Sequence, residues 1–100
     1  MTLDEIMQDI QACKEDLLVF ERKYGVPTEI FYESFRQGEE PEDDAWVLDW
    51  SEWAGTYEIL LDRQERYRQA VSSLLAQSSM PDLAHLIAKA ARREPVTVPA

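Results

Sequence analysis

A heptad pattern of large side chains dominates the second half of this 100-residue chain. Its positions are separated alternately by four and three residues, so they form one stripe along a helix of about nine turns. All three tryptophans lie on this stripe. We therefore predict a long helix over residues 44–76 that packs against other helices, either of the same chain or of another. The stripe consists of Trp46, Trp50, Trp53, Tyr57, Leu60, Gln64, Tyr67, Val71 and Leu74.

Within this long helix, we make separate predictions for Gly55, for Gln64 and for the pair of Asp62 and Arg66. Gly55 lowers the helix propensity, and we expect it to leave space for another backbone or ring to come close. Gln64 is polar on the apolar stripe, where a buried polar residue can fix register or oligomeric state. Asp62 lies four residues before Arg66, a spacing that favours an ion pair.

A second heptad pattern predicts a helix over residues 3–24. Thr2 and Glu5 have the spacing of a capping box at its start, and Gly25 is a typical stop after its end. These signals agree with the period of the apolar residues between them. The heptad positions are Leu3, Ile6, Ile10, Cys13, Leu17, Phe20 and Tyr24.

Two shorter helices complete the expected fold. Pro27 and Thr28 begin a helix over residues 28–37, in which Ile30, Phe31 and Phe35 share a face and Tyr32 lies to the side. Asp82 begins a helix over residues 82–93 after a break at residues 78–81. We expect the apolar face of this last helix to consist of Leu83, Leu86, Ile87, Ala90 and Ala91, with His85 at the surface or its boundary.

The predicted fold class is therefore all-α, with four helices packed as a helical hairpin or bundle in one domain over residues 1–94. Residues 95–100 are predicted to form a flexible, extended tail. Two fates are open for this β-prone tail: a frayed terminus, or a strand that adds to the edge of a partner's sheet.

Charge is distributed unevenly along the chain, whose formal net charge is −10. Residues 1–62 carry 17 acidic and 4 basic side chains, a net charge of −13, whereas residues 63–100 carry 3 acidic and 6 basic ones, a net charge of +3. The acidic part repels phosphate, which argues against direct binding of nucleic acid. It would attract a basic protein, or it serves only to keep a small protein in solution.

The strongest concentration of acidic residues lies at positions 39–44. One interpretation is a solvated loop in which Asp43 or Asp44 caps the next helix. The other is an electrostatic attraction for a basic partner. A calcium site is disfavoured because the segment lacks alternating spacers and a glycine at the sixth position. The acidic residues are Glu39, Glu40, Glu42, Asp43 and Asp44.

The residues that most enzymes of this size would need are missing from the sequence. Cys13 and His85 are the only cysteine and histidine, and there is no glycine-rich phosphate loop. We therefore predict a non-enzyme with no cofactor and no metal site. A single cysteine favours a reducing compartment. Without a signal peptide or an apolar run long enough for a membrane span, we expect a cytoplasmic protein with no membrane association.

Residues 20–60 resemble a group of small acidic bacterial and archaeal proteins that are antitoxins of type II toxin–antitoxin modules, some of them partners of TumE-type toxins. The chain departs from their pattern at Pro27 and Ile30, where a capping-box serine and glutamate would be expected, and it is longer between Gly38 and Trp53 by about one helical turn. The resemblance is carried by Lys23-Tyr24-Gly25, Phe31, Phe35, Gly38-Glu39, Asp43-Asp44 and Trp53-Ala54-Gly55-Thr56-Tyr57-Glu58.

This resemblance implies an antitoxin that binds a basic, RNA-acting toxin and masks its cleft. The acidic residues at 39–44 would supply charge, Tyr32 and Trp46 would anchor the toxin, and Val96 and Val98 would extend a toxin sheet. The alternative is a structural protein: a self-assembling homodimer whose coiled-coil stripe is fully covered by its own helices.

Overall fold

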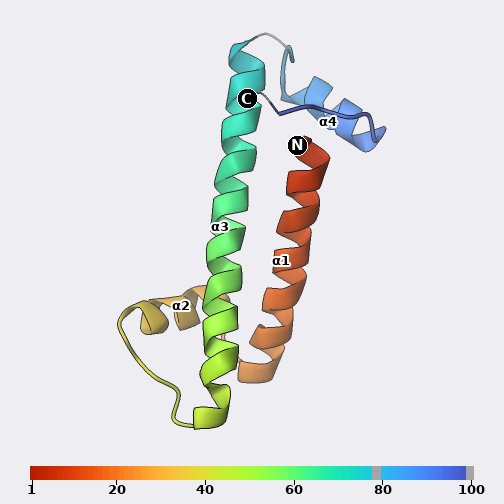
Figure 1. Ribbon diagram of the computed structural model, residues 1–100. Coiled ribbons are helices and arrows are strands. Elements are labelled where there is room, and N and C mark those ends of the chain that lie inside the picture. Colours follow the sequence, from red (N-terminus) through yellow and green to blue (C-terminus); the bar gives the residue numbers. More distant parts are fainter. Residues whose placement is uncertain (78–79, 99–100) are drawn as a thin grey trace. The chain divides into compact units, whose positions relative to one another are not determined.

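The described part of the chain, residues 1–77 and 80–98 of a computed structural model, is all-α (Figure 1). No β-strand occurs in these residues, which confirms the predicted fold class. None of their helices is long and apolar enough to cross a membrane. The helices are α1 (Leu3–Tyr24), α2 (Thr28–Arg36), a short 3₁₀ helix η1 (Asp44–Trp46), α3 (Val47–Ala76) and α4 (Leu83–Ala91).

The ends of the helices follow the chemistry expected from the sequence. The backbone N–H of Glu5 donates to Thr2 Oγ1, and the backbone N–H of Thr2 donates to Glu5 Oε1, which is the predicted capping box. Gly25 has φ +78°, and its N–H donates to the carbonyl of Glu21. Asp82 accepts a hydrogen bond from the His85 N–H at the start of α4. The predicted break between α3 and α4 includes Ser78 and Ser79, which lie outside the described residues.

The residue contacts divide the chain into two compact units. Unit 1 comprises Met1–Ile10 and Asp62–Ala100, and unit 2 comprises Gln11–Leu61. Helices α1 and α3 each contribute a segment to both units. In each unit, these segments of α1 and α3 pack against each other. The prediction of a single domain over residues 1–94 stays a prediction.

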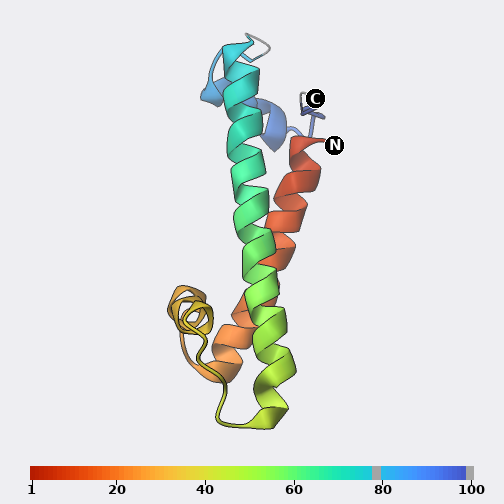
Figure 2. The ribbon, with the colours of Figure 1, turned by 60° about the vertical axis from the view of Figure 1, so that its left-hand side comes forward.

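In unit 1, the tail pairs with the beginning of the same chain. Thr2 and Thr97 form an isolated antiparallel bridge, flanked by hydrogen bonds from the Leu3 N–H to the Val96 carbonyl and from the Val98 N–H to the Met1 carbonyl. Figure 2 shows the tail beside the start of α1. The predicted extended tail is therefore present at residues 95–98 and pairs along one edge with the start of the chain, whereas its two predicted fates, a frayed terminus or a strand added to a partner's sheet, stay predictions. Residues 99–100 lie outside the described residues.

In unit 2, the core is built around Trp53, whose side chain is fully buried. Its ring stacks on Phe31 at a centroid distance of 3.8 Å and lies near Tyr24 and Phe20 at 5.5 and 5.8 Å. The indole Nε1–H donates to Thr28 Oγ1 at 3.0 Å. One tryptophan on α3 thus holds the end of α1 and the start of α2 together.

Two sequence expectations about helix faces are wrong. Ile30 was predicted to share a face with Phe31 and Phe35, but it is 57% exposed, and on α4 both Leu83 and Ile87 are exposed while Leu86 is buried. A helix of nine residues that packs along one narrow line buries only the side chains on that line. The space expected beside Gly55 is also not used, because no atom lies within 4 Å of where a Cβ would stand.

Candidate partner-binding site

An aromatic groove of about 650 Å³ opens in unit 2. Its walls come from the end of α1, from α2, from η1 and from the beginning of α3. Val26 and Ile30 form an exposed apolar lip. The rings that line the groove are those of Tyr24, Phe31, Trp46, Trp50 and Trp53.

The rings of the groove are held by edge-to-face contacts. Trp46 lies edge-on to Tyr24 at a centroid distance of 5.7 Å and an angle of 81°. Phe31 lies edge-on to Trp50 at 5.3 Å and 85°. These arrangements are the preferred ones for aromatic pairs, so they fix the walls without help from another chain.

Trp50 carries a buried polar atom with no hydrogen-bond partner. Its indole Nε1 is the one buried side-chain nitrogen or oxygen, among the described residues, for which no partner is present. The equivalent atom of Trp53 donates to Thr28. An unpaired buried donor costs about 1–3 kcal/mol relative to a paired one, so this N–H lowers the stability of the isolated chain.

The acidic loop, which we define as residues 39–44, is tied to the groove at both ends. Ser34, a groove residue, donates its hydroxyl to the Glu39 carboxylate at 2.5 Å. At the other end Asp43 accepts the Ala45 N–H at 2.9 Å, and the N–H of the groove residue Trp46 donates to the Asp43 carbonyl at 3.0 Å. The predicted capping role of Asp43 is therefore confirmed, and it places the loop beside the groove.

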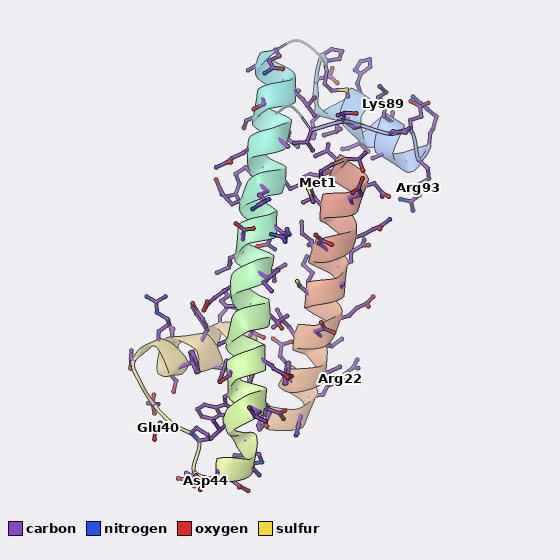
Figure 3. The ribbon with its side chains drawn as sticks, viewed as in Figure 1. Met1, Arg22, Glu40, Asp44, Lys89 and Arg93 are labelled. Atoms are coloured by element: carbon purple, nitrogen blue, oxygen red, sulfur yellow. The ribbon has the colours of Figure 1, made fainter. Side chains whose placement is uncertain are left out.

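Three carboxylates of the acidic loop remain exposed without a hydrogen bond or an ion pair in the described residues. They belong to Glu40, Glu42 and Asp44. Figure 3 shows Glu40 and Asp44 along the connection between α2 and α3. Because no described residue pairs with them, these side chains present negative charge on the connection between α2 and α3.

A cation at the groove is already neutralised. Lys23 Nζ lies 2.5 Å from the Asp49 carboxylate, which also accepts the Tyr24 hydroxyl at 2.6 Å. The hydrogen bonds from Lys23 and Tyr24 lower the pKa of Asp49. Partial burial, together with the hydrogen bond to Asp49, raises the pKa of Tyr24. Lys23 therefore adds no unpaired positive charge to the groove.

Charge is divided very unequally between the two units. Unit 2 contains 13 acidic and 4 basic side chains, a net charge of −9, whereas unit 1 contains 7 acidic and 6 basic ones, a net charge of −1. Nearly all of the net charge of the protein therefore belongs to the unit that contains the groove.

The predicted anchor residues have different surroundings. Trp46 lines the groove and is partly exposed. Tyr32 lies edge-on to Tyr57 at 4.9 Å, with the Arg36 guanidinium 5.9 Å from the centre of its ring. Val96 and Val98 belong to unit 1, where Val96 is buried against the chain's own residues. The predicted addition of this segment to a toxin sheet stays a prediction.

The other residues of the groove were not identified as site residues from the sequence. Trp50 and Trp53 were expected on the same stripe as Trp46, yet the stripe alone does not distinguish a core ring from a groove wall. The sequence indicates Tyr24 and Phe31 only as apolar positions of their helices. One sequence signal could have indicated them: Tyr24 directly precedes Gly25 and Phe31 comes soon after Pro27, so both lie close to the turn that joins their helices.

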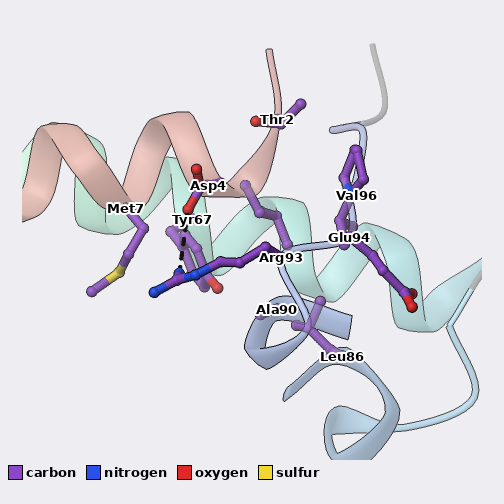
Figure 4. A pocket seen from close by; sticks show the side chains of 11 residues that line it. Thr2, Asp4, Met7, Tyr67, Leu86, Ala90, Arg93, Glu94 and Val96 are labelled. Carbon is purple, nitrogen blue, oxygen red and sulfur yellow. Dashed lines mark ion pairs between the residues drawn. The ribbon is translucent and has the colours of Figure 1, made fainter. Parts of the chain in front are cut away.

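Unit 1 contains a smaller cavity of about 230 Å³ beneath the tail (Figure 4). Leu3, Leu86 and Val96 contribute its apolar lining. The Arg93 guanidinium faces the Asp4 carboxylate across it at 3.9 Å. Both charges are largely exposed, so this pair contributes little to stability.

The described residues contain no group of three or more histidine, cysteine, aspartate or glutamate side chains that would hold a metal ion. Comparisons of the chain with protein-family models, with curated proteins and with solved structures found no match. The resemblance of residues 20–60 to antitoxins therefore stays a hypothesis.

Proposed function

We propose that this chain is a protein-binding module of the antitoxin class, which neutralises a basic, RNA-acting toxin by covering the toxin's cleft. The acidic loop supplies the charge that meets the toxin, and the aromatic groove supplies the apolar contact. The chain acts by occupying a surface rather than by catalysing a reaction.

One observation carries this proposal: the acidic loop is fixed to the groove at both ends, by Glu39 at Ser34 and by Asp43 at Trp46. An apolar centre with a charged margin is the usual construction of a protein–protein interface. The net charge of −9 in unit 2 favours rapid association with a basic protein at low salt. A self-assembling homodimer would instead bring two strongly acidic units together.

The function is tested by isolating and expressing the partner. The tagged chain is purified from its native cells at low salt, and the proteins released by a high-salt wash are identified by mass spectrometry. A recovered small basic protein is then expressed alone and together with this chain. We expect growth to stop when the basic protein is expressed alone and to recover on co-expression. Growth that is unaffected by the basic protein would contradict the antitoxin function.

The charge contribution is tested with a variant that leaves the loop attached. Glu40→Gln, Glu42→Gln and Asp44→Asn remove three charges but keep the loop's anchors Glu39 and Asp43. We expect weaker binding of the recovered basic protein and a smaller dependence of its Kd on salt. The matched control removes three exposed charges of unit 2 outside the loop, through Glu15→Gln, Asp16→Asn and Glu52→Gln. If both variants lost the same affinity for the basic protein, binding would depend on the net charge of unit 2 and not on the position of the loop.

A further inference from the structure

The cavity of unit 1 combines an apolar wall with two opposite charges that are open to solvent (Figure 4). Leu3, Leu86 and Val96, which contribute the apolar wall, are all buried. The cavity volume of about 230 Å³ lies below the roughly 300 Å³ at which pockets for drug-sized ligands begin. A ligand of this cavity is therefore a small molecule with a compact apolar part.

The two charges of the cavity lie close together but are not hydrogen-bonded to each other. Arg93 Nη1 lies 3.9 Å from Asp4 Oδ1, and the guanidinium has no other partner among the described residues. Asp4 Oδ2 accepts from Gln8 Nε2 at 2.8 Å, whereas Oδ1 accepts no hydrogen bond from the described residues. The hydroxyl of Tyr67, which also lines the cavity, has no hydrogen-bond partner in this part of the chain either. A cationic donor, an anionic acceptor and a hydroxyl are thus all available to a ligand.

The backbone of Arg93 is strained. Its φ is +59°, and no other non-glycine residue of the described chain has a positive φ. Arg93 follows the end of α4, at a position where glycine is the usual residue because a side chain is unfavourable in this conformation. The ion pair with Asp4 is largely exposed and contributes little to stability, so it does not offset the strain. The fold alone therefore gives no reason for an arginine here, and strain of this kind is common at binding sites.

The charges of the lining define the chemistry of the ligand. A monocarboxylate would be attracted by Arg93 but repelled by Asp4, and the reverse holds for a simple amine. Glu94, the remaining charged residue of the lining, already pairs with Arg92 Nε at 2.9 Å. A zwitterion satisfies both free charges at once, because its carboxylate accepts from the guanidinium while its ammonium donates to the Asp4 carboxylate.

We propose that the cavity of unit 1 binds a free α-amino acid with an aliphatic side chain. The carboxylate of the amino acid accepts from Arg93, the ammonium donates to Asp4 Oδ1, and the side chain packs against Leu86 and Val96. Because Val96 belongs to the tail that pairs with the start of the chain, the bound amino acid also stabilises this pairing. The site is separate from the proposed function, which depends on unit 2.

The proposal is tested by NMR with L-leucine as the probe. Leucine is titrated into the ¹⁵N-labelled full chain up to about 10 mM at constant pH and ionic strength, and we expect saturation with a Kd of about 1 mM or below. The backbone N–H signals that move should be those of residues lining the cavity. The three tryptophan indole signals, which all belong to unit 2, should stay in place.

Three related compounds test the parts of the ligand separately. Glycine lacks the apolar side chain, 4-methylpentanoate lacks the ammonium group, and 3-methylbutylamine lacks the carboxylate. Each should bind about tenfold or more weakly than leucine, because each leaves the apolar wall or one charge of the cavity without a partner.

Substitution of Arg93 separates recognition from folding. Arg93→Gly relieves the strain at φ +59°, so the melting temperature should not fall, while the affinity for leucine should fall by about tenfold or more. Arg93→Asn, which also tolerates this conformation, should lose binding in the same way. Asp4→Asn should weaken binding by about tenfold. The matched control is Arg68→Gln, which removes an exposed arginine of unit 1 outside the cavity and should leave the affinity within about twofold of wild type.

Three results would overturn the proposal. The first is the absence of saturation by about 10 mM leucine. The second is binding of 4-methylpentanoate or 3-methylbutylamine as tightly as leucine, which would mean that the cavity does not recognise a zwitterion. The third is an unchanged affinity for leucine in both Arg93→Gly and Arg93→Asn. None of these results bears on the proposed function, which fails separately if the recovered basic protein is not toxic.

Discussion

At the scale of single residues, Thr28 of α2 joins a side chain of α1 to a side chain of α3. It is almost completely buried, and its hydroxyl donates to the Glu21 carboxylate at 2.8 Å while accepting from Trp53 Nε1 at 3.0 Å. Its backbone N–H donates to the same carboxylate. Glu21 of α1 therefore caps α2, which explains how α2 begins after Pro27 without a side-chain cap from Pro27 itself.

We expect Thr28→Val to lower the free energy of unfolding by about 1–3 kcal/mol, because it leaves the buried Nε1–H of Trp53 unpaired. Thr28→Ser keeps the hydroxyl and should cost only about 1 kcal/mol for the lost methyl group. Urea denaturation followed by tryptophan fluorescence measures both. Combining Thr28→Val with Trp53→Phe should cost less than the sum of the single changes, and strict additivity would contradict a direct bond.

The pairing of Asp49 with Lys23 and Tyr24 predicts a pH dependence. Hydrogen bonds from Lys23 and Tyr24 lower the pKa of Asp49 in the folded state, so its contribution to stability is present above the unfolded value of about 4 and is lost as pH falls through the lower folded value. Asp49→Asn should therefore destabilise the protein at neutral pH, and the difference from wild type should shrink below about pH 4. Urea denaturation at several pH values measures this difference. If the difference in unfolding free energy between Asp49→Asn and wild type stayed constant below about pH 4, the lowered pKa of Asp49 would be contradicted.

At the scale of helices, α3 contains a glycine that its packing does not require. No atom lies within 4 Å of a Cβ built on Gly55, so an alanine would meet open space. Gly55→Ala should raise the free energy of unfolding by about 1 kcal/mol through helix propensity alone. Gly25→Ala is the contrasting control, because φ +78° after α1 strains an alanine and should destabilise by about 1 kcal/mol. Thermal unfolding distinguishes the opposite signs, and destabilisation by Gly55→Ala would mean that this position requires glycine.

Helix positions were more predictable than helix faces. The bounds of α1 follow from local chemistry, since Thr2 with Glu5 begins the helix and Gly25 ends it. The environment of Ile30 depends instead on which neighbour α2 meets, and that neighbour, Trp53, lies more than twenty residues away in sequence. Periodicity identifies the apolar side of a helix but not how much of that side is covered.

At the scale of the whole molecule, the candidate site was predictable in part. The acidic loop was visible in the sequence because charge is a local property, and the capping role of Asp43 follows from its position before a helix. The groove was not predictable, because it needs Tyr24, Phe31 and Trp50 from three helices to meet. The unpaired atom of Trp50 depends on positions within about an ångström, which no pattern of residue types conveys.

The concentration of charge in unit 2 predicts opposite effects of salt on folding and on binding. A net charge of −9 within 51 residues destabilises the compact state by self-repulsion, whereas ion pairs that salt would weaken, such as Arg68 with Glu65, are largely exposed and contribute little. Screening by sodium chloride should therefore raise the melting temperature of the isolated chain while it weakens the complex with a basic partner.

Calorimetry of the isolated chain at increasing sodium chloride measures the first effect, and titration with the basic partner over the same range measures the second. In the Glu40→Gln, Glu42→Gln, Asp44→Asn variant, both salt dependences should become smaller, because the same three unpaired carboxylates contribute to repulsion within the chain and to attraction between chains. If the melting temperature of the wild type fell with salt, the stabilisation by ion pairs would be larger than the destabilisation by repulsion between the acidic side chains. The charge of the acidic loop would then not be a measurable cost to the stability of the free protein.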